Sequence, residues 1–187
     1  ILRTKNISSI GICVPGIYHS KHGKVWAPNI KGWDNYPLRH EVEQISGGIP
    51  VSIDSDRACY ILGEAWKGSA KGCNDAIFLA VGTGIGAGIM SGGQIIRGGH
   101  DIAGAIGWLA LERPFRDEFA GAGCFEGMAS GEGIAKQARK FADQEHDYKG
   151  LLKGREINAH DVFEAYDQDD PIALKVIASA IEQWGMA

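Results

Sequence analysis

A fully apolar segment, residues 76–81, runs directly into a stretch in which glycine recurs at every second position, residues 82–88. The apolar run predicts a buried strand, and the glycines predict a tight turn into a second strand at residues 89–90. Alternate glycines let the backbone approach a ligand closely, and successive N–H groups in such a turn can hold an anion. Two interpretations stay open: a phosphate-binding loop in which Thr83 adds a hydroxyl donor, or a closely packed glycine-rich hairpin.

This glycine segment matches neither of the common nucleotide-binding motifs. The chain has no Gly-x-x-x-x-Gly-Lys segment, and the spacing Gly-x-Gly-x-x-Gly does not occur in it. A P-loop and a Rossmann dinucleotide site are therefore excluded.

Composition narrows the class of protein. Glycine accounts for 27 of 187 residues, about twice its usual share, while 44% apolar and 22% charged residues are ordinary for a globular chain. A run of about 18 apolar residues, which a membrane helix needs, is absent from the sequence. The net charge of −4 argues against a nucleic-acid surface. The four cysteines lack Cys-x-x-Cys spacing, so we expect neither a zinc ribbon nor a disulfide framework. No signal peptide opens the chain, and we therefore expect a cytoplasmic location.

The remaining pattern mixes strands with helices, which predicts an α/β or α+β fold. Predicted strands cover residues 8–14, 49–53, 76–81, 89–90 and 94–96. Predicted helices cover residues 38–45, 57–67, 124–142 and 158–166, and a last one runs from 170 onward. Residues 17–37 have the composition of a loop, and the second helix is expected to bury Ala58, Ile61, Leu62 and Ala65. The chain begins at Ile rather than Met and finishes inside a helical pattern, so we expect a piece of a longer protein.

Two carboxylates stand where the second strand turns into a helix, in Asp54-Ser55-Asp56. An Asp in such a corner can take the proton of a substrate hydroxyl, a role that Asp often plays in phosphoryl transfer. The alternative is that one Asp only caps the helix. Because Ser55 can serve as the cap, capping leaves Asp56 unexplained.

Other candidate residues have ordinary structural explanations beside the functional ones. Trp26, Trp33 and Trp108 could stack on a sugar ring, or they belong to the core. His100 and Asp101 follow two glycines and could face a ligand or simply form an exposed turn. Glu126 is a possible ligand contact or an ordinary acid in the first turn of a helix.

Taken together, these motifs resemble the ROK family (repressors, open reading frames and sugar kinases), nearly from end to end. The segments that carry the resemblance are Gly11-Ile12-Cys13-Val14-Pro15-Gly16, Ala27-Pro28-Asn29, Ile49-Pro50-Val51, Asp56, Leu62-Gly63-Glu64-Ala65, residues 82–88, Ala103-Gly104-x-Ile106-Gly107 and Gly123-Cys124-Phe125-Glu126. The resemblance implies the α/β actin-like ATPase (ribonuclease H-like) fold of two lobes, present here without its N- and C-terminal segments. Residues 1–70 would be part of the first lobe and residues 71–187 most of the second, with Asp56 and the glycine loop facing each other across a cleft.

The resemblance also implies roles for particular residues. Asp56 matches the catalytic base that takes the proton of the sugar hydroxyl attacking the γ-phosphate of ATP, with Mg²⁺ neutralising the phosphates. The residues that match the second phosphate loop are Gly82, Thr83, Gly84 and Gly86. The residues placed at the sugar are Asn29, Ser55, Asp56, Trp108 and Glu126.

Four departures from the family pattern alter these expectations. Ser55 replaces the usual Asn before the catalytic Asp, Ala105 replaces a sugar-binding Glu, and Trp108 replaces a His that binds both sugar and zinc. Of the three zinc cysteines only Cys124 is present, with Asp117 and Phe119 in the other places. A tetrahedral site needs four ligands, so we expect no zinc.

Two functions follow from the resemblance. The first is an ATP-dependent kinase acting on a hexose or amino sugar. The resemblance places the first phosphate loop upstream of this 187-residue piece and the adenosine-contacting glycines downstream of it, so we expect the isolated piece to bind ATP poorly and to be inactive. The second is a sugar-sensing transcriptional regulator or sugar-binding protein without phosphate transfer. A homodimer is expected by resemblance, and nucleic-acid binding is expected only if a helix-turn-helix lies upstream.

Overall fold

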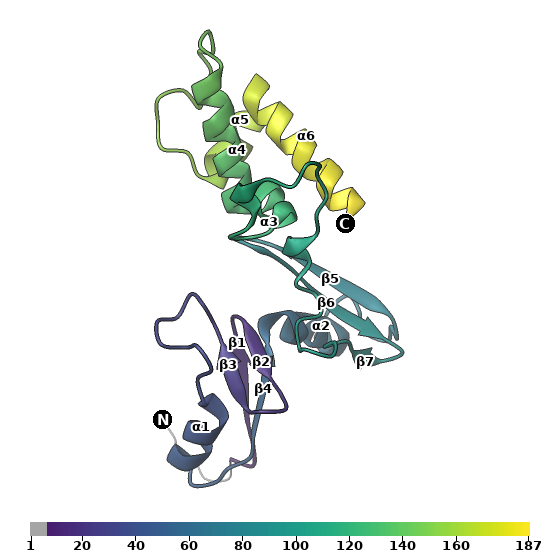
Figure 1. The fold of residues 1–187 in the computed structure, drawn as a ribbon. Helices are drawn as coiled ribbons and strands as arrows, with labels where there is room; N and C mark the ends of the chain where they lie inside the picture. Colours follow the sequence, from purple (N-terminus) through teal and green to yellow (C-terminus); the bar gives the residue numbers. More distant parts are fainter. Residues whose placement is uncertain (1–6) are drawn as a thin grey trace. The chain divides into compact units, whose positions relative to one another are not determined.

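A computed structural model describes residues 7–187, which form a mixture of strands and helices, as the sequence predicts (Figure 1). The chain divides into two compact units. The first runs to residue 78 and includes residues 87–104, whereas the second comprises residues 79–86 and 105–187. The described residues contain no helix long and apolar enough to cross a membrane.

The first unit is built on a parallel strand pair. Strand β1 (Ile10–Val14) pairs with β4 (Val51–Ser55), so that Val14 lies opposite Ser55. Parallel neighbours need a long crossover, and α1 (Leu38–Ile45) lies within this one, at the predicted bounds. The buried residues that form this core are Val14, Val25, Ala27, Leu38, Val51 and Ile53.

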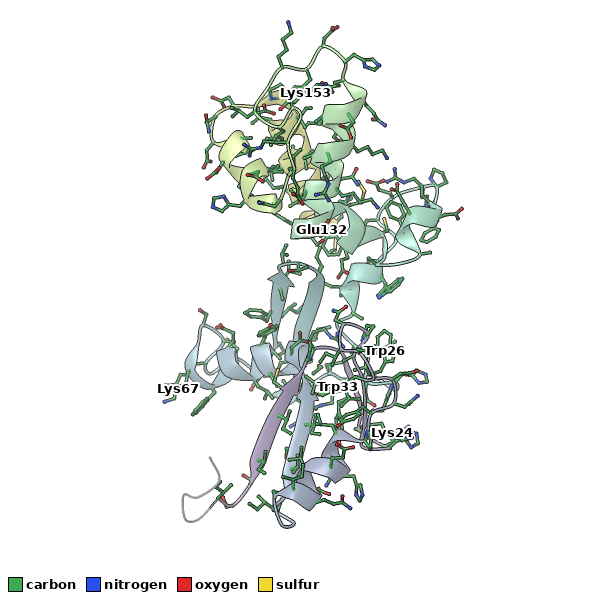
Figure 2. The ribbon with its side chains drawn as sticks, turned by 90° about the vertical axis from the view of Figure 1, so that its left-hand side faces the viewer. Lys24, Trp26, Trp33, Lys67, Glu132 and Lys153 are labelled. Carbon is green, nitrogen blue, oxygen red and sulfur yellow. The ribbon has the colours of Figure 1, made fainter. Side chains whose placement is uncertain are left out.

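The prediction of a loop over residues 17–37 was wrong in part. Strands β2 (Ile17–His19) and β3 (Lys24–Trp26) form an antiparallel hairpin there. Three-residue strands among Gly, Asn and Pro leave too short an alternation to detect. Of the tryptophans labelled in Figure 2, Trp26 is exposed, whereas Trp33 is half-buried and stacks on Tyr36 with ring centroids 4.9 Å apart.

Helix α2 (Asp56–Lys67) follows β4 without a loop. Ala58 and Ile61 are buried as predicted, but Leu62 is 44% exposed and Ala65 only half-buried. The apolar stripe of this helix is therefore narrower than the sequence indicates.

A small sheet joins strands in the order β5-β6-β7, namely β5 (Ala76–Val81), β6 (Ile85–Ser91) and β7 (Gln94–Ile95). Strand β5 has the predicted bounds, but the predicted turn is too long because β6 already begins at Ile85. At Gly88 of β6, helix α2 packs closely against the strand. A Cβ on Gly88 would come within 2.2 Å of the Arg57 carbonyl oxygen.

Helices make up most of the second unit (Figure 1). They are α3 (Cys124–Ala129), α4 (Gly131–Gln144), α5 (Ala159–Tyr166) and α6 (Pro171–Met186). The single helix predicted over residues 124–142 is divided at Ser130, which is 1% exposed. Its hydroxyl accepts the Gly133 N–H at 3.0 Å and begins α4 as an N-cap.

The start of α6 is fixed by one buried carboxylate. Asp170 is 4% exposed and accepts the N–H groups of Ile172 and Ala173, which makes it the N-cap of the helix. It also accepts the Tyr148 hydroxyl at 2.7 Å and the Leu151 N–H at 3.0 Å. Burial is the main cause that raises the pKa of Tyr148 to about 12. The Leu152 N–H lowers this pKa, and the hydrogen bond to Asp170 raises it by a smaller amount, so the hydroxyl stays protonated and donates.

Replacing Asp170 by Ala is expected to destabilise the fold by about 3 kcal/mol or more, because the cap is lost and four donors lose their acceptor. Denaturant unfolding of the full-length protein measures this. Asp169→Asn is the matched control, since Asp169 is exposed and has φ 57°, a conformation that Asn tolerates. Equal midpoints for the two variants would contradict the role given to Asp170.

Candidate active site

The two carboxylates at the end of β4 have different surroundings. Asp54 accepts the Arg97 Nε–H at 3.0 Å and forms an ion pair with the same guanidinium. Its other oxygen accepts the Ser55 N–H at 2.9 Å. Asp56 makes one hydrogen bond within residues 7–187, accepted by its Oδ1 from the Arg57 N–H at 2.8 Å. Both oxygens of Asp54 therefore already accept hydrogen bonds, whereas the Asp56 carboxylate can accept more.

Ser55 is the N-cap of helix α2. Its hydroxyl is buried and accepts the Ala58 N–H at 3.3 Å, which satisfies one orphan donor of the helix. The sequence left open whether an Asp caps this helix, and the structure assigns the cap to Ser55. Asp56 is the first residue of the helix and is half-buried.

Two glycines let neighbouring backbone lie against this corner. Gly104 has φ 82°, and a Cβ there would come within 1.8 Å of the Ala87 carbonyl oxygen. The Ala87 N–H donates to the Gly104 carbonyl at 2.8 Å, and the Arg57 side chain lies beside the same glycine. At Gly88 a Cβ would meet the Ile61 side chain as well as the Arg57 carbonyl. The strand-to-helix corner of Asp56 is thus held by close backbone contacts.

In the second unit, the glycine turn leads to a cavity of about 500 Å³. Its lining residues are Val81, Gly82, Thr83, Gly131, Glu132, Ile134, Ala159, Phe163 and Trp184. The Gly131 N–H donates to the Gly82 carbonyl at 2.8 Å, which fixes the turn against the first residue of α4. Glu132, labelled in Figure 2, lies in the same first turn of that helix. An apolar and aromatic wall beside a glycine turn suits a ligand with a flat ring and an anionic tail.

The four predicted phosphate-loop residues do not share one environment. Gly82 and Thr83 line the cavity, whereas Gly84 and Gly86 do not. Gly84 packs against the Glu126 carboxylate, and Gly86 lies in strand β6.

Glu126 carries a structural contact that sequence reasoning missed. Its Oε2 accepts the Ile85 N–H at 2.7 Å, across 41 residues of chain. A Cβ on Gly84 or Gly107 would come within 2.6 Å or 2.9 Å of Glu126 atoms, so both glycines leave room for this side chain. Nothing local in the sequence marks this contact, because it joins a helix to a distant turn.

A family model described as the ROK family matches residues 2–187. The chain belongs to the ROK family. A glucokinase of Halalkalibacterium halodurans is 33% identical over 178 residues, which are 92% of this chain and 53% of that protein. A xylose repressor of Caldicellulosiruptor bescii is 34% identical over 188 residues, which are 97% of this chain and 46% of the repressor. The chain thus spans about half the length of these ROK relatives.

A solved ROK family structure confirms the predicted fold. The structure is that of a glucokinase from Streptomyces griseus in complex with glucose and AMPPNP, and it matches this chain with a TM-score of 0.75 at 28% identity. The match covers 95% of this chain and 59% of the glucokinase chain. The α/β fold of the chain is therefore that of the actin-like ATPases.

The predicted sugar residues are divided between the two units. Asn29, Ser55 and Asp56 belong to the first unit, and Asn29 is exposed in a turn after β3. Trp108 and Glu126 belong to the second. Trp108 ends a short 3-10 helix (Ile106–Trp108) and is 58% exposed, so its ring is available for stacking. Their joint role at a sugar stays a prediction.

Of the other turn candidates, Asp101 has a structural contact. Asp101 has φ 60° and accepts the Ser20 N–H at 3.2 Å and the Ser20 hydroxyl at 3.0 Å. These bonds tie residues 97–104 to the end of β2. His100 is exposed beside them.

The residues present do not fit the zinc site of other ROK proteins. Cys124 is 1% exposed, and it supplies the single sulfur among the four ligand positions. Phe119 is also 1% exposed, and its buried aromatic ring carries no atom that could bind zinc. Among residues 7–187, His, Cys, Asp and Glu side chains form no group of three that could hold a metal ion. A tetrahedral site needs four nitrogen, sulfur or oxygen ligands, and the set here offers too few.

Two substitutions separate the structural role of Glu126 from sugar binding. Glu126→Ala is expected to destabilise the fold by about 2 kcal/mol, because the N–H of the buried residue Ile85 loses its acceptor. Glu126→Gln keeps an accepting oxygen and should lose much less. Thermal unfolding measures stability, and a sugar titration of the Gln variant measures binding. A large loss of sugar affinity in a fully stable Gln variant would show that the charge itself contacts sugar.

Proposed function

We propose that this chain supplies the catalytic base and a phosphate loop of an ATP-dependent sugar kinase, with a hexose or amino sugar as the acceptor. The observation that carries the proposal is the state of Asp56, whose carboxylate is open while Asp54 is paired with Arg97. Relatives named glucokinase and beta-glucoside kinase support the sugar-kinase class.

In the proposed reaction, a sugar hydroxyl donates its proton to an Asp56 carboxylate oxygen as the hydroxyl oxygen attacks the γ-phosphorus of ATP. The bond between that phosphorus and the β–γ bridging oxygen breaks, and ADP leaves. Such catalysis consists mainly of positioning and charge stabilisation, so a single well-placed base is enough on the acceptor side. Mg²⁺ would accompany ATP, held chiefly by phosphates and water, and would neutralise their charge.

The nucleotide is assigned to the cavity beside the glycine turn. Gly82 and Thr83 offer backbone and hydroxyl donors to phosphates. Phe163 and Trp184 offer ring faces to a base, and the Trp184 Nε1–H is already used by the Ala129 carbonyl at 3.0 Å. A glucokinase relative solved with AMPPNP supports a nucleotide site in this fold.

On the sugar side, Asn29, Ser55, Trp108 and Glu126 are proposed contacts. Trp108 would contribute a ring face rather than a hydrogen-bond pair, which favours recognition by stacking.

The second candidate is a sugar-sensing regulator that transfers no phosphate. The relative that favours this candidate is the xylose repressor, which is 34% identical over 97% of this chain. A regulator needs a sugar pocket but no base, so Asp56 would then have no chemical role.

One assay decides between them. ADP release by the full-length protein is measured with ATP, Mg²⁺ and a panel of hexoses and amino sugars, beside Asp56→Ala. Sugar-dependent turnover that collapses in the variant supports the kinase. Absence of turnover with every sugar, while sugars still raise the melting temperature, supports the sensor.

A further inference from the structure

We propose that Phe119 and Arg116 hold the irregular segment before α3 in place, by packing and charge, where a bound zinc would otherwise be needed. Residues 109–123 contain a single short 3-10 helix (Asp117–Phe119) and no strand. An irregular segment of this length needs anchors because ordering each residue costs conformational entropy. We name Glu112, Arg116, Glu118 and Phe119 the clasp.

Phe119 is the apolar part of the clasp. It is 1% exposed, and its ring lies against Gly127 of α3, where an added Cβ would be in ordinary contact at 3.6 Å. The Phe115 ring meets it edge-on with centroids 5.8 Å apart. The Phe119 carbonyl accepts the Gly123 N–H at 2.8 Å, directly before α3 begins. A buried ring thus fixes the middle of the segment to the helix that follows it.

Arg116 is the polar part of the clasp. Its guanidinium lies 4.5 Å from the centre of the Phe119 ring, a cation–π distance. It forms ion pairs with Glu112 at 2.9 Å and with Glu118 at 3.2 Å. Its Nη2 also lies 3.4 Å from the Met128 sulfur in α3. One side chain therefore joins the two glutamates of the segment to the aromatic ring and to a helix.

Each acid of the clasp reaches a further helix. Glu118 pairs with Lys136 and Lys140 of α4 at 3.6 and 3.9 Å. Glu112 accepts the Nε2–H of Gln183, which is buried in α6, at 3.0 Å. The segment is thereby connected to α3, α4 and α6, as a structural metal would connect its ligands.

The clasp also positions proposed sugar contacts, and this part of the inference rests on the proposed function. The Phe125 N–H donates to the Leu109 carbonyl at 3.2 Å. A Cβ on Gly123 would come within 2.7 Å of the Trp108 Cα, so the two ends of the segment touch. Loosening Phe119 would therefore shift Trp108, and Phe119 acts as a positioning residue.

The first test is the metal content of the full-length protein, produced in zinc-supplemented medium. Mass spectrometry is expected to find less than about 0.1 zinc per chain, and a strong zinc chelator should leave the melting temperature unchanged, because chelators unfold proteins that depend on structural zinc. One zinc per chain, with a melting temperature that falls on chelation, would overturn the proposal. This arm does not depend on any enzymatic activity.

The second test compares aromatic residues of the same segment. Phe119→Ala should lower the melting temperature by roughly 10 °C, whereas Phe115→Ala should change it little because Phe115 is 59% exposed. If Phe119→Ala does not fold, Phe119→Leu provides a milder loss, and Arg116→Met keeps the stem while removing the charge. Equal shifts for Phe119→Leu and Phe115→Leu would overturn the clasp.

The positioning role has its own readout. Below the melting temperature, Phe119→Leu should raise the sugar KM about tenfold while the KM for ATP changes less than about twofold. Equal changes in both constants would show that the residue is only structural. If the wild type shows no turnover, the proposed function fails, while the metal and melting results still decide the clasp.

Discussion

Replacing Asp56 by Asn in the full-length protein is expected to lower kcat by about three orders of magnitude while the sugar KM changes little. Asn keeps the size and one accepting oxygen of the side chain, but it cannot take the proton of the attacking hydroxyl. The N–H of Arg57 can still donate to the remaining oxygen, so the helix start should persist. Steady-state kinetics with the best sugar of the panel measures the effect.

Asp54→Asn is the matched control for this prediction. It removes the other carboxylate of the corner and breaks the ion pair with Arg97, which is partly exposed and contributes about 1 kcal/mol or less. The control should keep most of the rate and lose little stability. A large loss of rate in Asp54→Asn, with Asp56→Asn near normal, would transfer the base to Asp54.

Replacing Gly104 by Ala should abolish the stable fold of the full-length protein, a loss of about 4 kcal/mol or more. The residue has φ 82°, which a side chain rarely adopts, and its Cβ would stand 1.8 Å from the Ala87 carbonyl oxygen. Relief would require breaking the hydrogen bond from the Ala87 N–H to the Gly104 carbonyl. Because Arg57 packs on this glycine, the corner that carries Asp56 would be displaced with it.

Gly99→Ala is the control for Gly104→Ala. Gly99 lies in the same segment, has no positive φ, and an added Cβ there would have no atom within 4 Å. Its unfolding midpoint should match that of the wild type or rise slightly, because Ala reduces the freedom of the unfolded chain. The idea of a close backbone contact would fail if both variants unfolded at the same midpoint.

Much of the local structure followed from rules that act within a few residues. The bounds of α1 and β5 match the prediction, since apolar spacing and the following glycines define them. Helix α6 begins at Pro171, one residue from the start at residue 170 that the sequence predicts. The chain's motifs were specific enough to predict the ROK family, which the family model confirms.

The errors arose where a distant contact decided the outcome. Ser130 divides the predicted long helix because its buried hydroxyl caps α4, and Gly131 bonds to the glycine turn 49 residues earlier. The hairpin of residues 17–26 depends on the burial of Val25 in a core formed by other strands. Helix α2 leaves Leu62 exposed because the first unit covers only a narrow stripe of it.

By itself, the sequence determined the fold class, the family and the candidates for chemistry, because periodicity, caps and glycine turns depend on neighbours along the chain. Only the tertiary structure decided which of the candidate side chains already has a hydrogen-bond or ion-pair partner. It pairs Asp54 with Arg97 across 43 residues and leaves Asp56 open, and it joins Glu126 to Ile85 across 41 residues. Such pairings depend on which segments the fold brings together, and hydrogen bonds of this range leave no pattern in the residues beside them.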